Sequence, residues 1–140
     1  MKEHIVKKQI DITAPIEAVW DALTNPEKTK KYFFHCRVKS TWKPGSQITF
    51  KGRLFWIIPI ELRGVIDKVD QPWLLQYTLH NRKDSSQSVV TDKLTHKNGI
   101  TTIHITDDVG SGEGAEKRYR KSVKGWDKVL KGLKELCEEN

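Results

Sequence analysis

A chain of 140 residues is long enough to bury one hydrophobic core but not two, so we expect a single domain spanning residues 1–140. Its 36% hydrophobic and 31% charged residues are typical of a folded globular protein and exclude a disordered segment. The net charge of +7 would permit nucleic-acid binding, but the lysines are spread along the chain and no nucleic-acid-binding motif occurs, so we expect no nucleic-acid partner.

The first segment, residues 4–12, alternates in hydrophobicity. Val6, Ile10 and Ile12 share one parity while polar residues take the other, which is the period of a half-buried strand. Lys8 breaks the apolar face. The pattern predicts a strand that lays one side on the core.

Two short helices are predicted next. Pro15 suits the first turn of a helix because its missing N–H would be unbonded there anyway, and Val19, Trp20 and Leu23 form an apolar face. Asn25 ends that helix and is placed to cap a second one, which we expect to continue to about residue 34.

Residues 36–107 read as an antiparallel meander of strands rich in Val, Ile, Thr, Phe and Trp. Asn98-Gly99 is the clearest hairpin signal, since a type I′ turn requires positive φ at both central residues. The strands are predicted to be separated at Pro44-Gly45, Gly64, Gln71-Pro72, Asp84-Ser85-Ser86 and Asn98-Gly99.

The strongest periodicity lies in the C-terminal segment, where a helix is predicted from Ala115 to Cys137. Its apolar face is formed by Ala115, Tyr119, Val123, Trp126, Leu130, Leu133 and Cys137. Its opposite face carries Lys117, Lys121, Lys124, Lys128 and Lys131, which we expect to be exposed rather than part of a binding groove. The elements predict an α+β fold, in which a one-sided sheet and a one-sided helix bury their apolar faces on each other.

Several sequence motifs carry a family resemblance. Residues 12–24, ITAPIEAVWDALT, resemble the opening of START-like, birch-pollen-allergen-type domains (the SRPBCC superfamily), and residues 125–134, GWDKVLKGLK, resemble the final helix of that superfamily. WKPG at 42–45 and DQP at 70–72 are similar to the branch formed by homologues of the activator of heat-shock-protein-90 ATPase. The resemblance covers essentially the whole chain.

The resemblance implies a helix-grip fold: a curved antiparallel sheet of about six to seven strands wrapped on the long C-terminal helix, with two short helices after the first strand. It also implies a cavity between sheet and helix where many relatives bind apolar molecules. The scaffold carries lipid transfer, cyclase or dehydratase chemistry and chaperone regulation in different relatives, so function does not follow from the fold alone.

Aromatic side chains on the strands and the long helix are the candidates for lining this cavity. Tyr119 stands apart, because its hydroxyl group needs a partner in an apolar space and could orient the polar end of a ligand. The predicted cavity residues are Phe50, Phe55, Trp56, Trp73, Tyr77, Tyr119, Val123 and Trp126. Ligand entry is expected near the glycine-rich residues 110–114 and the apolar residues 54–60.

Catalytic and metal-binding patterns are missing from the sequence. No GxSxG, Cys-His or HExxH motif occurs, and the histidines lack metal-ligand spacing, although His96 and His104 could face each other across the last hairpin. We expect Asp107-Asp108 to interact favourably with the positive, N-terminal end of the dipole of the C-terminal helix. An acid/base role would instead require one of the two side chains to point into the cavity. No catalytic residue, metal or cofactor is predicted.

Cys36 and Cys137 lie a hundred residues apart without a CxxC spacing, which predicts buried free thiols in a reducing compartment. No apolar run is long enough to cross a bilayer and the N-terminus lacks a secretion signal, so we expect a cytoplasmic protein without membrane insertion.

The function that fits these observations best is binding of an apolar or amphipathic small molecule, such as a lipid, polyketide or aromatic metabolite, in the cavity. One alternative is a protein-interaction module of the chaperone-ATPase-activator type, with a chaperone or another protein as partner and a role in the stress response. The other is a cyclase, dehydratase or hydrolase that uses the same cavity. The expected state in solution is a monomer or weak homodimer.

Overall fold

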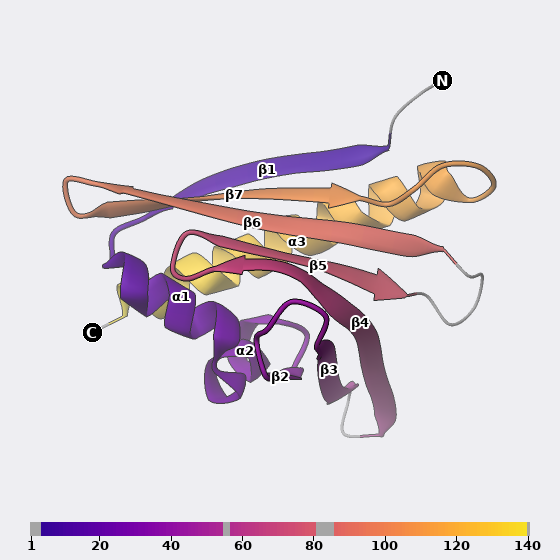
Figure 1. The fold of residues 1–140 in the computed structure, drawn as a ribbon, viewed down its shortest axis with the longest axis horizontal. Helices are drawn as coiled ribbons and strands as arrows, with labels where there is room; N and C mark the ends of the chain where they lie inside the picture. The colour runs from indigo at the N-terminus through magenta and orange to yellow at the C-terminus, as the bar shows by residue number, and fades with distance from the viewer. Residues whose placement is uncertain (1–3, 55–56, 81–85, 140) are drawn as a thin grey trace.

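The computed structural model describes residues 4–54, 57–80 and 86–139, in which strands and helices follow the predicted order (Figure 1). The elements are β1 (Ile5–Ile12), α1 (Ile16–Thr24), α2 (Pro26–Tyr32), β2 (Arg37–Ser40), β3 (Gln47–Leu54), β4 (Ile58–Asp70), β5 (Leu74–His80), β6 (Gln87–Lys97), β7 (Ile100–Asp108) and α3 (Ala115–Glu138). The expected strand, pair of short helices, meander and long helix are confirmed.

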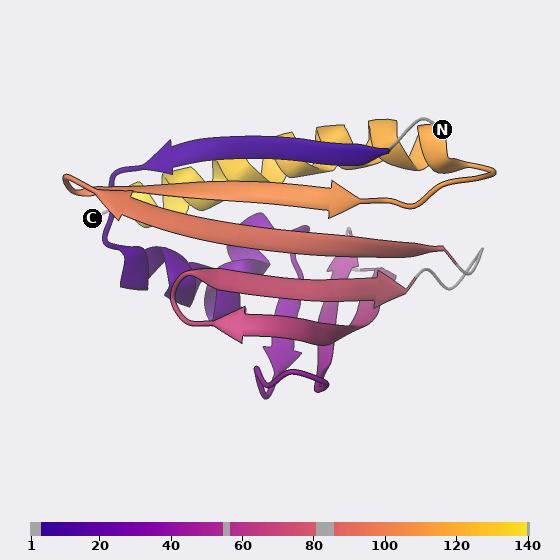
Figure 2. The same cartoon turned by 45° about the horizontal axis from the view of Figure 1, so that its top comes forward.

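The strands form one antiparallel sheet in the order β1-β7-β6-β5-β4-β3-β2. Figures 1 and 2 show a strongly curved sheet, with α3 running along one face and β3 turned away from the direction of β6 and β7. The register of β4 against β5 shifts between Ile66 and Lys68, and such a bulge bends a strand. The curved sheet gripping a long helix confirms the helix-grip fold.

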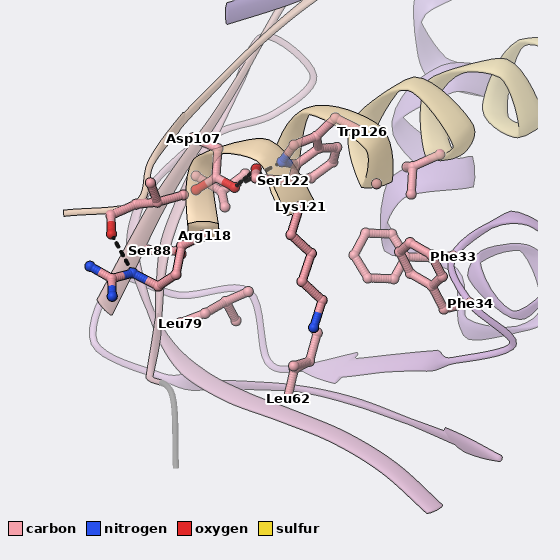
Figure 3. A pocket seen from close by; sticks show the side chains of 14 residues that line it. Phe33, Phe34, Leu62, Leu79, Ser88, Asp107, Arg118, Lys121, Ser122 and Trp126 are labelled. Carbon is pink, nitrogen blue, oxygen red and sulfur yellow. Dashed lines mark hydrogen bonds between the residues drawn. The ribbon is translucent and has the colours of Figure 1, made fainter. Parts of the chain in front are cut away.

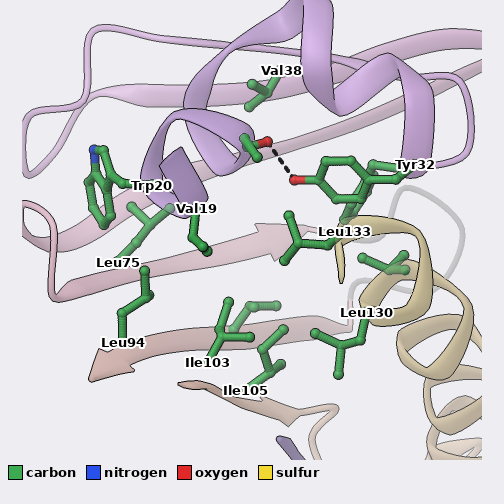
Figure 4. Packing of buried hydrophobic residues seen from close by; sticks show 14 of the residues in the cluster. Val19, Trp20, Tyr32, Val38, Leu75, Leu94, Ile103, Ile105, Leu130 and Leu133 are labelled. Atoms are coloured by element: carbon green, nitrogen blue, oxygen red, sulfur yellow. Dashed lines mark hydrogen bonds between the residues drawn. The ribbon is translucent and has the colours of Figure 1, made fainter. Parts of the chain in front are cut away.

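The apolar faces of the sheet and the helices meet in one core (Figure 4). Ile12 of β1, Ile103 of β7 and Leu133 of α3 are completely buried there, as the strand and helix periodicities predict. α3 packs against β1 and against the two short helices. Asn25 caps α2 as expected, because its side chain accepts a hydrogen bond from the Glu27 backbone N–H at 3.0 Å.

The turn signals divide into correct and incorrect predictions. Asn98 and Gly99 both have positive φ (52° and 78°) and join β6 to β7, so that hairpin is confirmed. Gly64 does not separate strands as expected: it lies inside β4, where a Cβ atom would come within 2.1 Å of the Thr78 carbonyl oxygen. Glycine is required there by close approach of the neighbouring strand, not by a turn. Of the predicted separator at 84–86, residues 84 and 85 lie outside the described residues.

The polar face of α3 points to solvent as predicted, since Lys117, Lys121, Lys124, Lys128 and Lys131 are all exposed. In the described part of the chain, no helix combines the length and apolar character needed to cross a membrane.

Candidate functional site

A mainly apolar pocket of about 280 Å³ lies between α3, the end of α2 and strands β4 to β7 (Figure 3). This volume is close to the lower limit of small-molecule sites, about 300 Å³. The pocket is lined by Phe33, Phe34, Leu62, Leu79, Ser88, Val90, Asp107, Val109, Arg118, Lys121, Ser122, Gly125, Trp126 and Val129.

The large side chains on the helix stripe and the strand faces predict an enclosed cavity, but the pocket is an open cleft. The reason is the position of α3, which packs over β1 and the short helices and leaves the part of β4 and β5 around Leu62 and Leu79 open. Figure 3 shows Lys121 reaching from α3 toward Leu62 of β4, across this opening. Lys121 is therefore exposed, as predicted, but it also lines the pocket, which corrects its assignment to a purely solvated face.

A series of aromatic rings leads from the pocket into the core. Phe33 is edge-on to Phe34 at 5.6 Å between ring centroids and to Trp126 at 6.1 Å, and it stacks on Phe50 at 4.6 Å. Phe50 in turn lies 5.9 Å from Tyr77. Phe34 has φ of 49°, a left-handed conformation that is costly for a bulky side chain. The strained backbone places adjacent phenylalanines at the pocket, with Phe33 buried and Phe34 39% exposed.

Asp107 supplies a buried carboxylate in the pocket wall. It is 5% exposed, and its Oδ2 accepts hydrogen bonds from Ser122 Oγ at 2.6 Å and from Trp126 Nε1 at 2.9 Å. The expectation that it favours the start of α3 is wrong, because Asp107 continues the inward parity of Ile103 and Ile105 on β7. The neighbouring Asp108 points outward and accepts a hydrogen bond from the Gly110 backbone N–H.

A second carboxyl group, Asp92 of β6, is 3% exposed and lines a separate inner void of about 20 Å³. Val90 pairs with Asp107 across β6 and β7, so Asp92 and Asp107 are diagonal neighbours on the same sheet face. Burial, followed by the charge of Asp107, raises the pKa of Asp92 to about 7. Burial, followed by Asp92 and Asp107, likewise raises the pKa of Tyr77 well above its usual range.

The predicted cavity residues fall into separate places. Trp126 lines both the pocket and the inner void, whereas Phe50 and Tyr77 line only the inner void. Trp73 is 48% exposed in the turn between β4 and β5. Phe55 and Trp56 lie outside the described residues.

Tyr119 and Val123 do not line the pocket. Tyr119 packs edge-on against His4 at 6.1 Å, so its hydroxyl is not placed to orient a ligand there. Tyr119 and Val123 belong to the side of α3 that packs over β1. Besides Trp126, the pocket uses the adjacent side of α3, with Ser122, Gly125 and Val129.

Sequence reasoning missed this adjacent side of α3 because serine and glycine are not apolar and do not mark a buried helix face. It also missed Asp92 and Asp107, although a signal was present. Both aspartates occupy inward-facing positions in strands with an otherwise apolar inner face, between Val90 and Leu94 and after Ile105. A carboxyl group at such a position indicates a buried polar site.

The loop from Gly110 to Gly114 lies in sequence between the pocket residues Val109 and Arg118, and it is held in place. The Arg118 side chain donates hydrogen bonds to the backbone oxygens of Val109, Ser111 and Glu113. In the predicted entry segment 54–60, Ile57 and Ile58 are 81% and 53% exposed. Entry through these segments remains a prediction.

The histidines do not pair as considered from the sequence. His96 lies opposite Thr101 and His104 opposite Lys93, which puts the two rings on different faces of the sheet. Within the described ranges, no group of three His, Cys, Asp or Glu side chains could hold a metal ion. Cys36 is buried, Cys137 is half-buried and both are free; burial raises the pKa of each thiol to about 11.

Comparison with known proteins identifies relatives along the full length of the chain. The family model of Activator of Hsp90 ATPase homolog 1-like protein matches residues 13–138. The solution structure of ChR145 from Cytophaga hutchinsonii is 34% identical, with 99% of this chain and 97% of that chain covered and a TM-score of 0.76. No functionally curated protein matches the chain in sequence.

Two more distant structures share the fold. The Aha1 dimer from Colwellia psychrerythraea is 17% identical, covering 96% of each chain with a TM-score of 0.75. DynU16, a protein of the dynemicin biosynthetic locus, is 17% identical, covering 96% of this chain and 47% of that chain with a TM-score of 0.77. Because the family model spans nearly all of the sequence and the fold agrees with it, the chain belongs to the family of Activator of Hsp90 ATPase homolog 1-like proteins.

Proposed function

We propose that the chain is a single helix-grip domain, and that it binds a small apolar or amphipathic molecule in the pocket between its sheet and α3. The observation that carries this proposal is the pocket itself, whose wall is built largely from the rings and aliphatic side chains of Phe33, Phe34, Leu62, Leu79 and Trp126. Apolar surface left open to water is favourable to cover, at about 25 cal/mol per Å². The occurrence of DynU16 in a biosynthetic locus agrees with small-molecule binding on this fold.

Another cleft is larger, about 550 Å³, and lies between α1 and the turn that joins β4 to β5. Its lining is more polar and includes Glu17 and Asp21, and the Asp21 carboxylate is already paired with Lys28 at 2.5 Å. We assign binding to the smaller pocket because it combines apolar walls with a buried carboxylate, and volume alone does not make a ligand site.

Titration with the fluorescent probe 1-anilinonaphthalene-8-sulfonate tests this proposal. Gly125 lines the pocket, and a Cβ atom there would meet the Phe34 ring at an ordinary 3.6 Å, so Gly125→Leu should fold and fill the cleft. We expect at least tenfold weaker probe binding by this variant. Lys128→Leu adds the same side chain at an exposed α3 position that does not line the pocket, and should bind like the wild type. Equal probe binding by all three proteins would contradict the proposal.

A second candidate function is activation of a chaperone ATPase, which the family membership and the exposed basic face of α3 favour. Steady-state ATPase measurements with an Hsp90-class chaperone test it. Replacing Lys124, Lys128 and Lys131 by Glu should abolish a salt-sensitive stimulation while leaving probe binding intact. No stimulation by the wild-type protein would exclude this function.

The proposed state in solution is a monomer or weak homodimer. The Aha1 relative is a dimer, and the exposed Ile57 and Ile58 at the start of β4 are the residues we expect in a contact between copies. Sedimentation of Ile58→Glu beside the wild type should show loss of any dimer.

A further inference from the structure

The carboxylate of Asp107 has one oxygen that the protein leaves without a partner. Oδ2 is fully engaged by Ser122 Oγ and Trp126 Nε1, whereas Oδ1 is buried and has no hydrogen-bond partner among the described residues. Figure 3 shows Asp107 beside Ser122 and Trp126 in the pocket wall. A buried acceptor without a donor is costly, and in native proteins such groups usually have a partner.

The protein holds this carboxylate in a fixed position. Asp107 lies on β7, which is paired with β1 on one side and β6 on the other, and its two donors lie one helical turn apart on α3. The side chain is therefore clamped from the helix and the sheet together. An acceptor that is clamped, buried and lacking a donor is suited to receive a hydrogen bond from a molecule in the pocket.

The surroundings of Asp107 define what else that molecule contains. Trp126, Phe33 and Phe34 present rings to the pocket, and Leu79 and Val109 line it with aliphatic groups. Rings of this kind stack well on flat apolar molecules. The volume of about 280 Å³ limits the buried part of the ligand to a small ring system.

The charges at the pocket decide between a neutral donor and a cationic one. Arg118 and Lys121 both line the pocket, so two positive charges oppose the attraction of a ligand ammonium group to Asp107. A hydroxyl group can donate to the carboxylate without that repulsion. We infer that the pocket selects apolar ring compounds that carry a hydroxyl group, which donates a hydrogen bond to Oδ1 of Asp107. This inference rests on the proposed function.

A matched pair of probes tests the inference. 2-Naphthol carries the donor, and 2-methylnaphthalene has nearly the same shape without it. Equilibrium dialysis of the wild-type protein should show 2-naphthol binding at least about tenfold more tightly, the usual effect of one hydrogen bond to a charged group. A third probe, 2-(aminomethyl)naphthalene, should bind more weakly than 2-naphthol.

The variant Asp107→Asn tests whether Asp107 causes the preference for 2-naphthol over 2-methylnaphthalene. The new amide must use its oxygen to accept from Ser122 and Trp126, which puts the NH₂ group in the place of Oδ1 and replaces an acceptor by a donor. The preference for 2-naphthol should fall to about one while 2-methylnaphthalene binding is retained. Asp108→Asn is the matched control, because Asp108 is exposed and does not line the pocket, and it should keep the wild-type preference.

The outcomes separate the two proposals. Binding of neither probe to the wild type would overturn the proposed function and this inference with it. Equal binding of the two neutral probes would overturn the inference alone, as would tightest binding of the amine or an unchanged preference in Asp107→Asn. The wild-type comparison decides even if Asp107→Asn does not fold.

Discussion

Replacing Asp92 by asparagine should change how the stability of the protein depends on pH. Burial and the charge of Asp107 raise the pKa of Asp92 from about 3.8 to about 7 in the folded protein, whereas the unfolded chain keeps the ordinary value. Below about pH 4, Asp92 is protonated in both states and therefore does not lower the free energy of unfolding. Between about pH 4 and 7 the unfolded state loses this proton and the folded state retains it, so the free energy of unfolding falls as the pH rises.

The size of the effect follows from the same interval. One pH unit corresponds to about 1.4 kcal/mol, so the loss is at most about 4 kcal/mol above pH 7. The amide introduced by Asp92→Asn does not titrate, and the variant therefore lacks this loss. The groups that act electrostatically with Asp92 are Asp107, Tyr32 and Tyr77, and all of them remain in the variant.

Urea denaturation of both proteins at pH 4, 5, 6, 7 and 8 measures this contribution. The other titrating groups largely cancel in the difference between variant and wild type, and a constant offset arises from burying an amide in place of a carboxyl group. We expect the variant to gain stability relative to the wild type as pH rises, with a plateau above about pH 7. A difference that stays flat from pH 4 to 8 would refute the argument that Asp92 is buried and protonated.

Three further predictions concern packing and thiol chemistry. Trp126→Ala should lower the free energy of unfolding by roughly 3 kcal/mol in urea titrations, because a large ring is removed from the edge of the core. A near-neutral effect would show that packing of this ring does not stabilise the fold. Gly64→Ala should prevent folding or lower the melting temperature severely, since its Cβ atom would come within 2.1 Å of the Thr78 backbone oxygen, and a wild-type melting curve would contradict that approach. Titration with a thiol reagent should find two free thiols in denaturant but slow reaction of Cys36 and Cys137 in the native protein, because burial raises both thiol pKa values to about 11, and rapid native reaction would show that they are accessible.

The arrangement of elements could be predicted because it depends on local patterns. The alternation in residues 4–12 fixes which face of β1 is buried, and the stripe through Leu130 and Leu133 fixes the core side of α3. The Asn98-Gly99 turn carries its own backbone requirement. These features need no knowledge of which strand lies beside which.

The site could be predicted only in part, because it depends on contacts between distant elements. Trp126 is recognisable as a large ring on the apolar helix face, but Gly125 has no side chain to give a signal. It lines the pocket because α3 leaves the part of β4 and β5 around Leu62 and Leu79 open. Asp107 precedes α3 in sequence, which favours an assignment to the helix start, yet its strand parity turns it inward. The donors that hold it, Ser122 and Trp126, become its neighbours only through packing of the helix on the sheet.

The central claim, that a small apolar molecule binds in the pocket between sheet and α3, is tested most directly by NMR chemical-shift mapping with 2-naphthol. The Gly125 amide lies at the pocket and the Trp126 indole N–H donates to Asp107, so both resonances report on that wall. We predict that these two signals move together with saturable shifts, while the amide of Trp73 in the distant turn stays unchanged. Shifts that leave Gly125 and Trp126 unmoved, or that gather around Trp73, would contradict the account.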